Sequence, residues 1–354
     1  MLRFNGKVIV ITGGTGSLGK ILTRRILSGE RGLPKKLIIF SRDEAKQHYM
    51  RVHYEHQAKA TDEVIYNNFR RVLEFRIGDI RDYASVSSVL QGAEIVVNAA
   101  ALKQVPSCEY FPSEAFRTNV LGAENIVRAI HVENLPVQTV VGVSTDKACK
   151  PVNAMGLTKA LQERVFIAAN ILAPRTRFIC VRYGNVLASR GSVIPLFLEQ
   201  IRTGGPVTIT TGDMTRFLLP LERAVDTIYA ALDGARPGEI YVPKVKASRI
   251  VEVAKALIGK RDIKIKVTGI RPGEKVHEIL VSDEEAWRTS SRGDYYIIRP
   301  MLPELDREKG AKPALAREFS SGDYLMTNDQ VRKLLKRYDL LAGRNVSESD
   351  EVLR

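Results

Sequence analysis

The run Val8-Ile-Val-Ile-Thr-Gly-Gly-Thr-Gly-Ser-Leu-Gly19 decides the fold of this chain. Four β-branched apolar residues precede Thr12, and glycines then follow at positions 13, 16 and 19 in the pattern T-G-x-x-G-x-x-G. Such a strand, turn and helix start are typical of a dinucleotide-binding βαβ unit. Small residues let the backbone turn sharply and approach a pyrophosphate, and the helix N-terminus offers N–H groups to the phosphates.

The first 190 residues continue this unit by alternating short apolar runs with longer amphipathic segments. Runs that are apolar throughout are typical of strands buried on both faces of a parallel sheet. Six such strands with right-handed crossovers predict an α/β fold with a Rossmann-like, doubly wound parallel sheet. We expect strands over 8–12, 37–40, 72–77, 95–98, 139–144 and 178–183, and helices over 16–27, 84–90, 113–132 and 154–169.

Glycine and proline break the chain into shorter pieces after residue 190. We therefore expect residues 1–190 to form the dinucleotide-binding domain, with segments returning to it from about 218–245. Residues 191–302 are expected to form mainly a smaller substrate-binding region over the carboxyl ends of the strands. Residues 303–354 are expected to form a charged tail with one helix over 329–341, capped by Thr327 or Asn328.

The segment 45–71 is rich in His, Tyr and Arg, which raises the question of a metal site. Of its three histidines only His53 and His56 have helical contact spacing, and no cysteine or nearby aspartate completes a ligand set. We expect a solvated polar helix here and no metal site in the chain.

The composition is that of a folded protein with a strong positive charge. Its 54 Lys+Arg against 40 Asp+Glu give a net charge of +14, and 44% hydrophobic residues exclude disorder of the whole chain. No run approaches the roughly 20 apolar residues of a membrane span, and the first strand begins too early for a signal peptide. Three cysteines form neither a disulfide framework nor a zinc pattern, so we expect a cytoplasmic protein.

The excess positive charge predicts an anionic partner, which could be nucleic acid, an anionic membrane surface or a small polyanion. Basic pairs are scattered along the chain rather than gathered in one stripe, and no nucleic-acid-binding motif accompanies them. We therefore expect no nucleic-acid partner, and part of the charge to serve anionic small molecules.

The end of the second predicted strand indicates which dinucleotide binds. An acidic residue usually holds the ribose of NAD at this point, whereas Ser41 and Arg42 suit the 2′-phosphate of NADP. We favour NADP, with NAD as the alternative that Asp43 leaves open. The other expected cofactor contacts are Gly13, Thr15, Gly16, Ser17, Leu18 and Gly19 at the phosphates, Asp79 and Ile80 at the adenine, and Ala99, Ala100 and Ala101 along the fourth strand's end.

Three features together resemble the extended short-chain dehydrogenase/reductase family: the glycine turn, the small-residue run after Asn98, and Ser144-Thr-Asp-Lys147 ahead of a helix with Lys159. Within that family, five motifs, two of which extend features just named, are similar to those of the UDP-N-acetylglucosamine 4,6-dehydratases. The motifs are AAALKQV over 99–105, STDKA over 144–148, VRYGNV over 181–186, MTRF over 214–217 and RPGEK over 271–275.

The resemblance implies the 4,6-dehydration of a UDP-N-acetylhexosamine, with UDP-N-acetylglucosamine (UDP-GlcNAc) the first choice, for polysaccharide biosynthesis. Hydride passes from C4 to NADP+, water leaves across C5–C6, and the same hydride returns to C6. By this resemblance Asp146 is the acid at C6, Lys147 the base at C5, and Thr145 the hydrogen-bond partner of the C4 oxygen. We expect burial beside the cofactor to lower the pKa of Lys147 enough for this role.

One position departs from the wider family, which has Tyr-x-x-x-Lys where this chain has Met155 and Lys159. A thioether transfers no proton, so the C4 hydroxyl must lose its proton through Thr145 and water, through Asp146 or through Lys159. Lys159 is still expected to bind the nicotinamide ribose. Some of the dehydratases that the chain resembles also have Met at this position. For the configuration at C5, we favour retention over inversion.

The resemblance also implies substrate contacts and an assembly. Lys103 is expected to face the sugar, and Glu274 to hold the uridine ribose. The expected contacts to the diphosphate are Asn185, Arg216 and Arg271. A homo-oligomer is expected, with a UDP-sugar as the small-molecule partner.

Three alternatives compete with the dehydratase. A nucleotide-sugar 4-epimerase returns the hydride to C4 and needs no acid at C6, which Asp146 speaks against. In a non-catalytic NADP binder, replacement of Asp146 or Lys147 would leave the function unchanged. A nucleic-acid binder would use the basic pairs.

Overall fold

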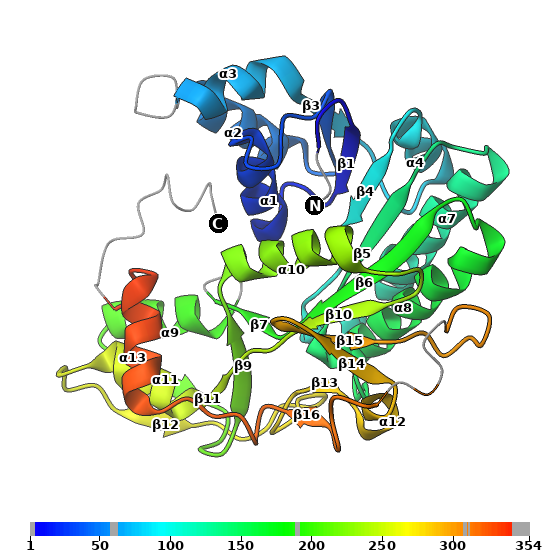
Figure 1. Ribbon diagram of the computed structural model, residues 1–354. Helices are drawn as coiled ribbons and strands as arrows, with labels where there is room; N and C mark the ends of the chain where they lie inside the picture. The colour runs from blue at the N-terminus through cyan, green and yellow to red at the C-terminus, as the bar shows by residue number, and fades with distance from the viewer. Residues whose placement is uncertain (1–3, 57–62, 188–191, 307–309, 311, 342–354) are drawn as a thin grey trace.

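A nine-stranded sheet runs through the centre of the computed structural model, which describes residues 4–56, 63–187, 192–306, 310 and 312–341 (Figure 1). Its strand order is β14-β15-β10-β6-β5-β4-β1-β2-β3. The strands from β10 to β3 in this order are parallel, and the hairpin β14–β15 adds an antiparallel edge. The strands are β1 (Val8–Thr12), β2 (Lys36–Ser41), β3 (Leu73–Ile77), β4 (Ile95–Asn98), β5 (Thr139–Thr145), β6 (Arg177–Tyr183), β10 (Ile240–Pro243), β14 (Thr289–Arg292) and β15 (Tyr295–Ile298).

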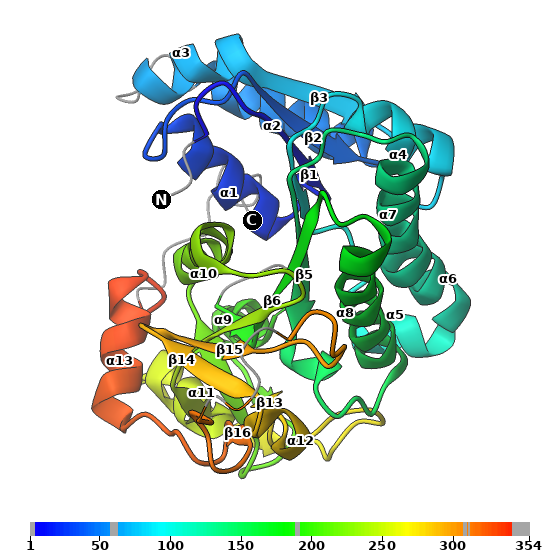
Figure 2. The ribbon, with the colours of Figure 1, turned by 45° about the vertical axis from the view of Figure 1, so that its right-hand side comes forward.

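Helices cover both faces of this sheet (Figure 2). Helices α1 (Ser17–Leu27) and α10 (Leu221–Gly234) lie on one face, and α4 (Tyr83–Leu90), α7 (Gly122–Val132) and α8 (Ala154–Leu172) lie on the other. Alternate residues of β1 enter the two resulting cores: Ile9 and Ile11 pack with α1 and α10, and Val10 packs with α4 and α7. The predicted Rossmann-like, doubly wound fold is confirmed.

A second, smaller set of elements follows the sixth strand and has an apolar cluster of its own. It contains the three-stranded sheet β11-β9-β7 and the pairs β12–β8 and β13–β16. Its elements are β7 (Asn185–Val186), α9 (Val193–Arg202), β8 (Val207–Ile209), β9 (Thr215–Leu219), β11 (Ala247–Arg249), α11 (Ile250–Ile258), β12 (Ile265–Val267), β13 (Ile279–Val281), α12 (Asp283–Ala286), β16 (Phe319–Ser320) and α13 (Asn328–Arg337).

The helix expected over 113–132 is interrupted. Helices α5 (Val105–Tyr110) and α6 (Pro112–Phe116) come first, and the π-helical turn η2 (Arg117–Leu121) then leads into α7. Inside η2 the buried Asn119 side chain bonds the backbone N–H and C=O of Leu102 and the hydroxyl of Thr158. The wider turn thus satisfies buried polar groups of three segments, which periodicity alone does not predict.

The prediction of a solvated polar helix over 45–71 is wrong. The segment forms two helices, α2 (Glu44–His56) and α3 (Glu63–Val72), on either side of residues outside the described part. Met50 and Tyr54 of α2, and Ile65 and Phe69 of α3, are buried, and the Tyr54 and Phe69 rings stack at 5.4 Å. The i, i+4 spacing of these apolar residues forms a buried stripe that the many charged neighbours conceal.

The predicted C-terminal helix exists but ends four residues early. Thr327 caps α13 in a capping box with Gln330, and the chain leaves the helix at Asp339, whose φ is +53°. Val331 and Leu335 of α13, and Leu340 beyond it, are buried in the apolar cluster of the smaller set of elements. The described part of the tail therefore contributes to the core.

A buried charge network joins the two sets of elements. The Arg182 guanidinium on β6 donates to both carboxylate oxygens of Glu163 on α8 and to both of Glu285 on α12. It also donates to the carbonyl of Leu280 on β13. Both carboxylates are buried, so loss of the guanidinium would leave Glu163 without an ion-pair partner among the described residues and Glu285 with Arg288 alone, 3.7 Å away.

We expect Arg182→Met to lower the free energy of unfolding by about 3–5 kcal/mol, because it removes the guanidinium that pairs with two buried carboxylates. Urea unfolding measures the change. The matched control is Arg202→Met, which removes an exposed pair with Glu199 and should leave the midpoint unchanged. Equal effects of the two substitutions would contradict this assignment.

Candidate active site

The glycine turn between β1 and α1 fits a diphosphate. Gly13 has φ +65°, and a Cβ there would lie 2.7 Å from the Cα of Ala100, so the two backbones touch. Gly16, at the N-cap of α1, supplies no side-chain cap, and the first turn of α1 holds no acidic residue. No side chain therefore caps the N–H groups at the N-terminus of α1, where the helix dipole is positive. This helix end suits a phosphate group.

The adenosine end of the expected cofactor site lies at the ends of β2 and β3. Arg42 Nη1 lies 3.5 Å from Asp79 Oδ2, whereas Arg81 approaches the same oxygen to 2.6 Å. Partial burial opposes ionisation, but the hydrogen bonds from Arg81 and the charge of Arg42 lower the pKa of Asp79. Ser41 accepts a hydrogen bond from Gln47, and Ile80 is buried under Gly122. Arg81 is thus the main partner of Asp79, and half-exposed Arg42 is available to an anion.

The predicted catalytic residues lie where β5 ends. Thr145 closes the strand, and Asp146 and Lys147 form a short 3-10 turn, η3 (Asp146–Ala148). Asp146 is 0% exposed, so the pair is not a solvated loop. Thr145 Oγ1 donates to Asp146 Oδ1 at 2.9 Å, and Lys147 Nζ donates to the same oxygen at 3.0 Å. An acid, a base and a hydroxyl are therefore in direct contact.

Glu278 completes this cluster and was not predicted from the sequence. It lies just before β13, is 2% exposed, and places Oε1 3.0 Å from Lys147 Nζ. Arg216 Nε lies 3.7 Å from the same oxygen. The only sequence signal is that Glu278 follows the RPGEK motif closely, and nothing in its local pattern indicates burial beside Lys147.

The electrostatics of the cluster correct one expectation. Burial raises the pKa of Asp146, with Lys147 opposing and the charge of Glu278 reinforcing the rise. Desolvation lowers the pKa of Lys147, but the charges of Asp146 and Glu278 outweigh it and raise that pKa. The expected low pKa of Lys147 is therefore wrong for the protein without bound substrate, because two carboxylates contact its ammonium group.

Three buried acceptor atoms around the cluster have no hydrogen-bond partner among the described residues. They are Asp146 Oδ2, Glu278 Oε2 and Asn185 Oδ1. Gly184, the neighbour of Asn185, lies against the first of these atoms, since a Cβ on it would lie 3.1 Å from Asp146 Oδ2. Unpartnered buried acceptors are costly, so their convergence suits a ligand rich in hydroxyl donors.

Lys159 and Met155 lie on α8 beside this cluster but do different things. Lys159 Nζ donates to the carbonyl of Val143 and to Gln162 Oε1, each at 2.6 Å. Burial lowers the pKa of Lys159 to about 8. Met155 is buried in a small apolar cluster with Cys108 and Ala115. Met155 therefore acts as a packing residue at the position where the wider family has Tyr.

The predicted substrate residues are only partly brought together. Arg216 is buried, and its Nη1 donates to the carbonyls of Thr215 and Val276, so it belongs to the Glu278 cluster. Lys103 and Arg271 are exposed, and Glu274 accepts a hydrogen bond from the Arg271 backbone at 3.4 Å.

Two hydrogen bonds attach the loop 271–275 to residues 149–153, which follow the predicted catalytic turn η3. Asn153, the N-cap residue of α8, donates to the carbonyl of Gly273 at 2.8 Å. Lys275 Nζ donates to the carbonyl of Cys149 at 2.6 Å. Cys149 itself is buried, and burial raises the pKa of its thiol, so it is a packing residue and not a nucleophile.

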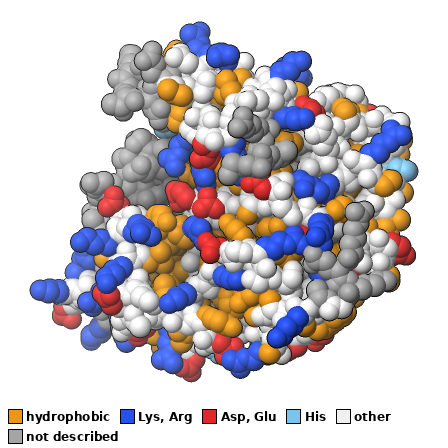
Figure 3. All heavy atoms as spheres, in the orientation of Figure 1, with side chains coloured by type: hydrophobic (Ala, Val, Ile, Leu, Met, Phe, Trp, Pro, Cys, Tyr) orange, Lys and Arg blue, Asp and Glu red, His pale blue; other side chains and the backbone are white. Residues whose placement is uncertain are grey.

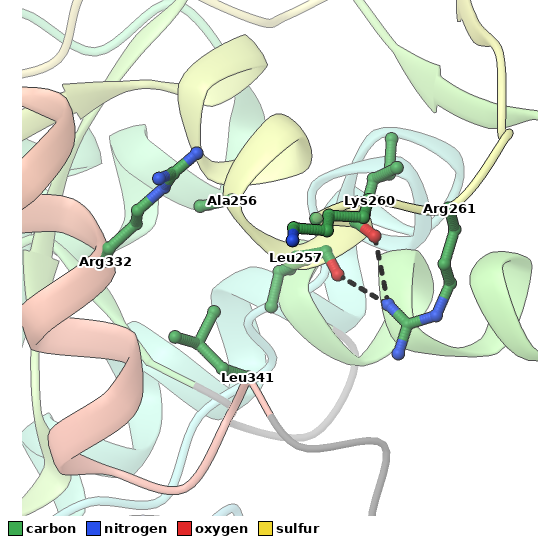
Figure 4. Close-up of a pocket in the computed structure, with 8 residues that line it drawn as sticks. Ala256, Leu257, Lys260, Arg261, Arg332 and Leu341 are labelled. Atoms are coloured by element: carbon green, nitrogen blue, oxygen red, sulfur yellow. Dashed lines mark hydrogen bonds between the residues drawn. The ribbon is translucent and has the colours of Figure 1, made fainter.

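Other surface features lie apart from this cluster. A groove between α11 and α13 is lined by Ala256, Leu257, Lys260, Arg261, Arg332 and Leu341, among others, and holds none of the predicted site residues (Figure 4). Lys and Arg side chains are spread over the face in Figure 3 and alternate with acidic ones. Within the described ranges, no helix is long and apolar enough to span a bilayer, and no three His, Cys, Asp or Glu residues are grouped as metal ligands.

Residues 9–300 match the family described as "Polysaccharide biosynthesis protein". The chain belongs to this family. The proteins named UDP-glucose 4-epimerase from Rickettsia typhi and Rickettsia conorii are 43% and 44% identical to it. Each alignment covers 95% of this chain and 97% of the relative.

Solved structures support the same placement. The X-ray structure of Pen from Bacillus thuringiensis is 31% identical, with a TM-score of 0.84 over 96% of this chain and all of that one. The dTDP-glucose 4,6-dehydratase DesIV from Streptomyces venezuelae, solved with NAD and TYD bound, is 19% identical, with a TM-score of 0.67 over 97% of this chain and 99% of its own. The latter likeness shows the fold alone. The resemblance to extended short-chain dehydrogenases/reductases is thus confirmed at the level of family and fold.

The lowered pKa of Lys159 predicts a pH-dependent stability. The folded protein releases this proton near pH 8, while the unfolded chain keeps it until about the ordinary value of 10.5. The unfolded state then binds more protons between these values, so stability from this group rises with pH in that window. Below pH 8 both states are protonated, and the folded state carries the full cost of a buried cation.

We expect the free energy of unfolding of the wild type, relative to Lys159→Met, to rise by up to about 3 kcal/mol between pH 8 and 10.5. The Val143 carbonyl still accepts a hydrogen bond in this variant, because Gln162 Nε2 also donates to it. Urea unfolding of nucleotide-free protein at several pH values measures the difference. A difference that stays constant over the window would contradict the lowered pKa.

Proposed function

We propose that this protein is an NADP-dependent hydro-lyase that converts a UDP-N-acetylhexosamine, UDP-GlcNAc first, to its 4-keto-6-deoxy sugar. The observation that carries the proposal is the buried contact between Asp146 and Lys147, which join an acid and a base at one point. Elimination of water across C5–C6 needs such a pair, because a proton leaves C5 while another reaches the departing C6 hydroxyl.

The raised pKa of Asp146 supports its role as the acid. Burial favours the protonated carboxyl, and a protonated carboxyl can donate to the C6 hydroxyl. Lys147 must be neutral to accept the C5 proton. After elimination Asp146 is ionised and Lys147 is charged, which is the pairing that the contact between them favours.

The partly buried hydroxyl of Thr145 supports a route for the C4 proton without the usual Tyr. Thr145 Oγ1 already donates to Asp146, so a C4 hydroxyl that donates to Oγ1 would be linked to the carboxylate by two hydrogen bonds. A proton that moves along them leaves Asp146 protonated, ready to act as the acid at C6. This route combines the Thr145 and Asp146 alternatives, and its second hydrogen bond already exists in the structure.

The glycine turn, the Ala99–Ala101 backbone and Lys159 would hold the nicotinamide cofactor. When bound, it supplies reversible hydride transfer at the sugar. The uncapped N-terminus of α1 suits its diphosphate, and Arg42 suits the 2′-phosphate of NADP. Lys159 adds positive charge beside the site. Lys103, Asn185 and Arg271 are proposed to bind the nucleotide sugar, with Glu274 at the ribose.

The second candidate is a UDP-glucose 4-epimerase, which is how the Rickettsia relatives are named. Epimerisation requires one proton acceptor at O4 and no proton transfer at C5 or C6. The two candidates therefore differ in whether deuterium from solvent enters C5 and whether water is lost.

The deciding experiment incubates purified protein separately with UDP-GlcNAc and UDP-glucose in D2O. Mass spectrometry and proton NMR follow the products. Loss of one water with deuterium at C5 from UDP-GlcNAc is the expected result, and the product spectrum also reports C5 configuration. A C4 epimer without loss of water would establish the epimerase instead.

We expect Asp146→Asn to lower the rate of dehydration at least about 100-fold, because an amide donates no proton to the leaving hydroxyl. Asp329→Asn, on the exposed start of α13, is the matched control and should keep the wild-type rate. Dehydration is followed by mass spectrometry at saturating UDP-GlcNAc. A rate within threefold of wild type in Asp146→Asn would exclude Asp146 as the acid.

We expect Arg42→Ala to weaken NADP binding about tenfold or more relative to NAD, because a charge-assisted contact to the 2′-phosphate is lost. Arg76→Ala removes a nearby exposed arginine that pairs with Glu74 and serves as the control. Calorimetric titration of nucleotide-free protein with both dinucleotides gives the ratio. An unchanged preference would place the 2′-phosphate elsewhere.

A further inference from the structure

Among the residues that the structure describes, Glu278 is the one buried carboxylate from a distant part of the chain that contacts the predicted catalytic pair. It comes from the segment that leads into β13, whereas Asp146 and Lys147 follow β5. Its Oε1 contacts Lys147 Nζ at 3.0 Å, equal to the distance from Nζ to Asp146 Oδ1. The lysine nitrogen is thus held between two carboxylates.

Other contacts fix Glu278 itself. Its backbone N–H donates to the Ser321 hydroxyl at 2.9 Å, and Arg216 Nε lies 3.7 Å from Oε1. Arg216 is in turn anchored to the carbonyls of Thr215 and Val276. The carboxylate therefore has a defined position before substrate binds.

We propose that Glu278 is a positioning residue for Lys147: it holds the amino group beside Asp146 and sets the pH at which the pair can act. The effect of Glu278 on catalysis rests on the proposed function. The contact between Glu278 and Lys147 does not depend on it. Without Glu278, Asp146 is the remaining ion-pair partner of Lys147 Nζ in the described part of the chain, and the lysine stem is flexible.

The charges that face the pair define the expected pH effect. Asp146, Glu278 and Arg216 face Lys147, and Lys275 adds positive charge near Glu278. The negative charge of Glu278 raises the pKa of both Asp146 and Lys147. Replacing it by a neutral amide of the same shape should lower both values.

The first test is the pH profile of kcat/KM for UDP-GlcNAc in the Glu278→Gln variant. Both limbs of the profile should move to lower pH by about one unit, because the variant removes a like charge from beside Asp146 and an opposite charge from beside Lys147, and either change lowers a pKa by about that much. KM should stay within about threefold, because the proposed role of Glu278 is to hold Lys147, and Arg216 keeps its hydrogen bonds to the carbonyls of Thr215 and Val276. The matched control is Glu318→Gln, which neutralises a carboxylate 2.9 Å from surface Lys150 and should leave the profile in place.

The second test separates positioning from charge. Glu278→Leu removes both the acceptor and the charge, so deuterium exchange at C5 should fall at least about tenfold while reduced cofactor still forms from C4 oxidation. A purely structural role would lower both steps together and leave the Glu278→Gln profile unmoved, and that result overturns the proposal.

The third test does not depend on the substrate. Carbon-13 NMR of lysine-labelled protein, as purified, follows the titration of Lys147, assigned with Lys147→Arg. The Lys147 titration should move to lower pH in Glu278→Gln. An unmoved titration overturns the proposal, whereas failure of the wild type to dehydrate UDP-GlcNAc overturns only the proposed function.

Discussion

The Arg182 guanidinium between Glu163 and Glu285 is the interaction on which the arrangement of this protein depends. It joins the central sheet, the helix that carries Lys159 and the segment after β13. Without it, Glu163 would have no ion-pair partner among the described residues and Glu285 would have only Arg288 at 3.7 Å, so the guanidinium ties both helices to the sheet. Glu163 also accepts a hydrogen bond from Ser144, which directly precedes the Thr145-Asp146-Lys147 triplet. The network thus couples the position of β13 to that of the candidate active site.

The same rule of paired buried charges operates at the candidate active site, with a different result. There Lys147 and Arg216 face Asp146 and Glu278, but one oxygen of each carboxylate has no partner among the described residues. A structural network such as that of Arg182 satisfies its oxygens, whereas a reactive one keeps acceptors for a ligand. The contrast between the two clusters is the main physical support for placing chemistry at the end of β5.

Most of the architecture could be predicted from local patterns. The buried strands and the glycine turn are encoded by residues that are neighbours in the chain, and their ends agree with the structure to within one or two residues at β1, β4 and β6. The errors arose where burial depends on distant partners. Charged residues concealed the apolar stripe of α2 and α3, and the tail looked solvated although Leu335 and Leu340 pack into a core.

By itself the sequence determined the fold class, the phosphate-binding turn and the Thr145-Asp146-Lys147 triplet, because each depends on residue types at short spacing. Only the tertiary structure decided that Glu278 and Arg216 join that triplet, that Met155 packs with Cys108, and that Lys147 holds its proton more tightly than expected. The reason is electrostatic. A pKa depends on charges within a few ångströms in space, and one of the two carboxylates that raise the pKa of Lys147, that of Glu278, comes from a distant segment of the chain.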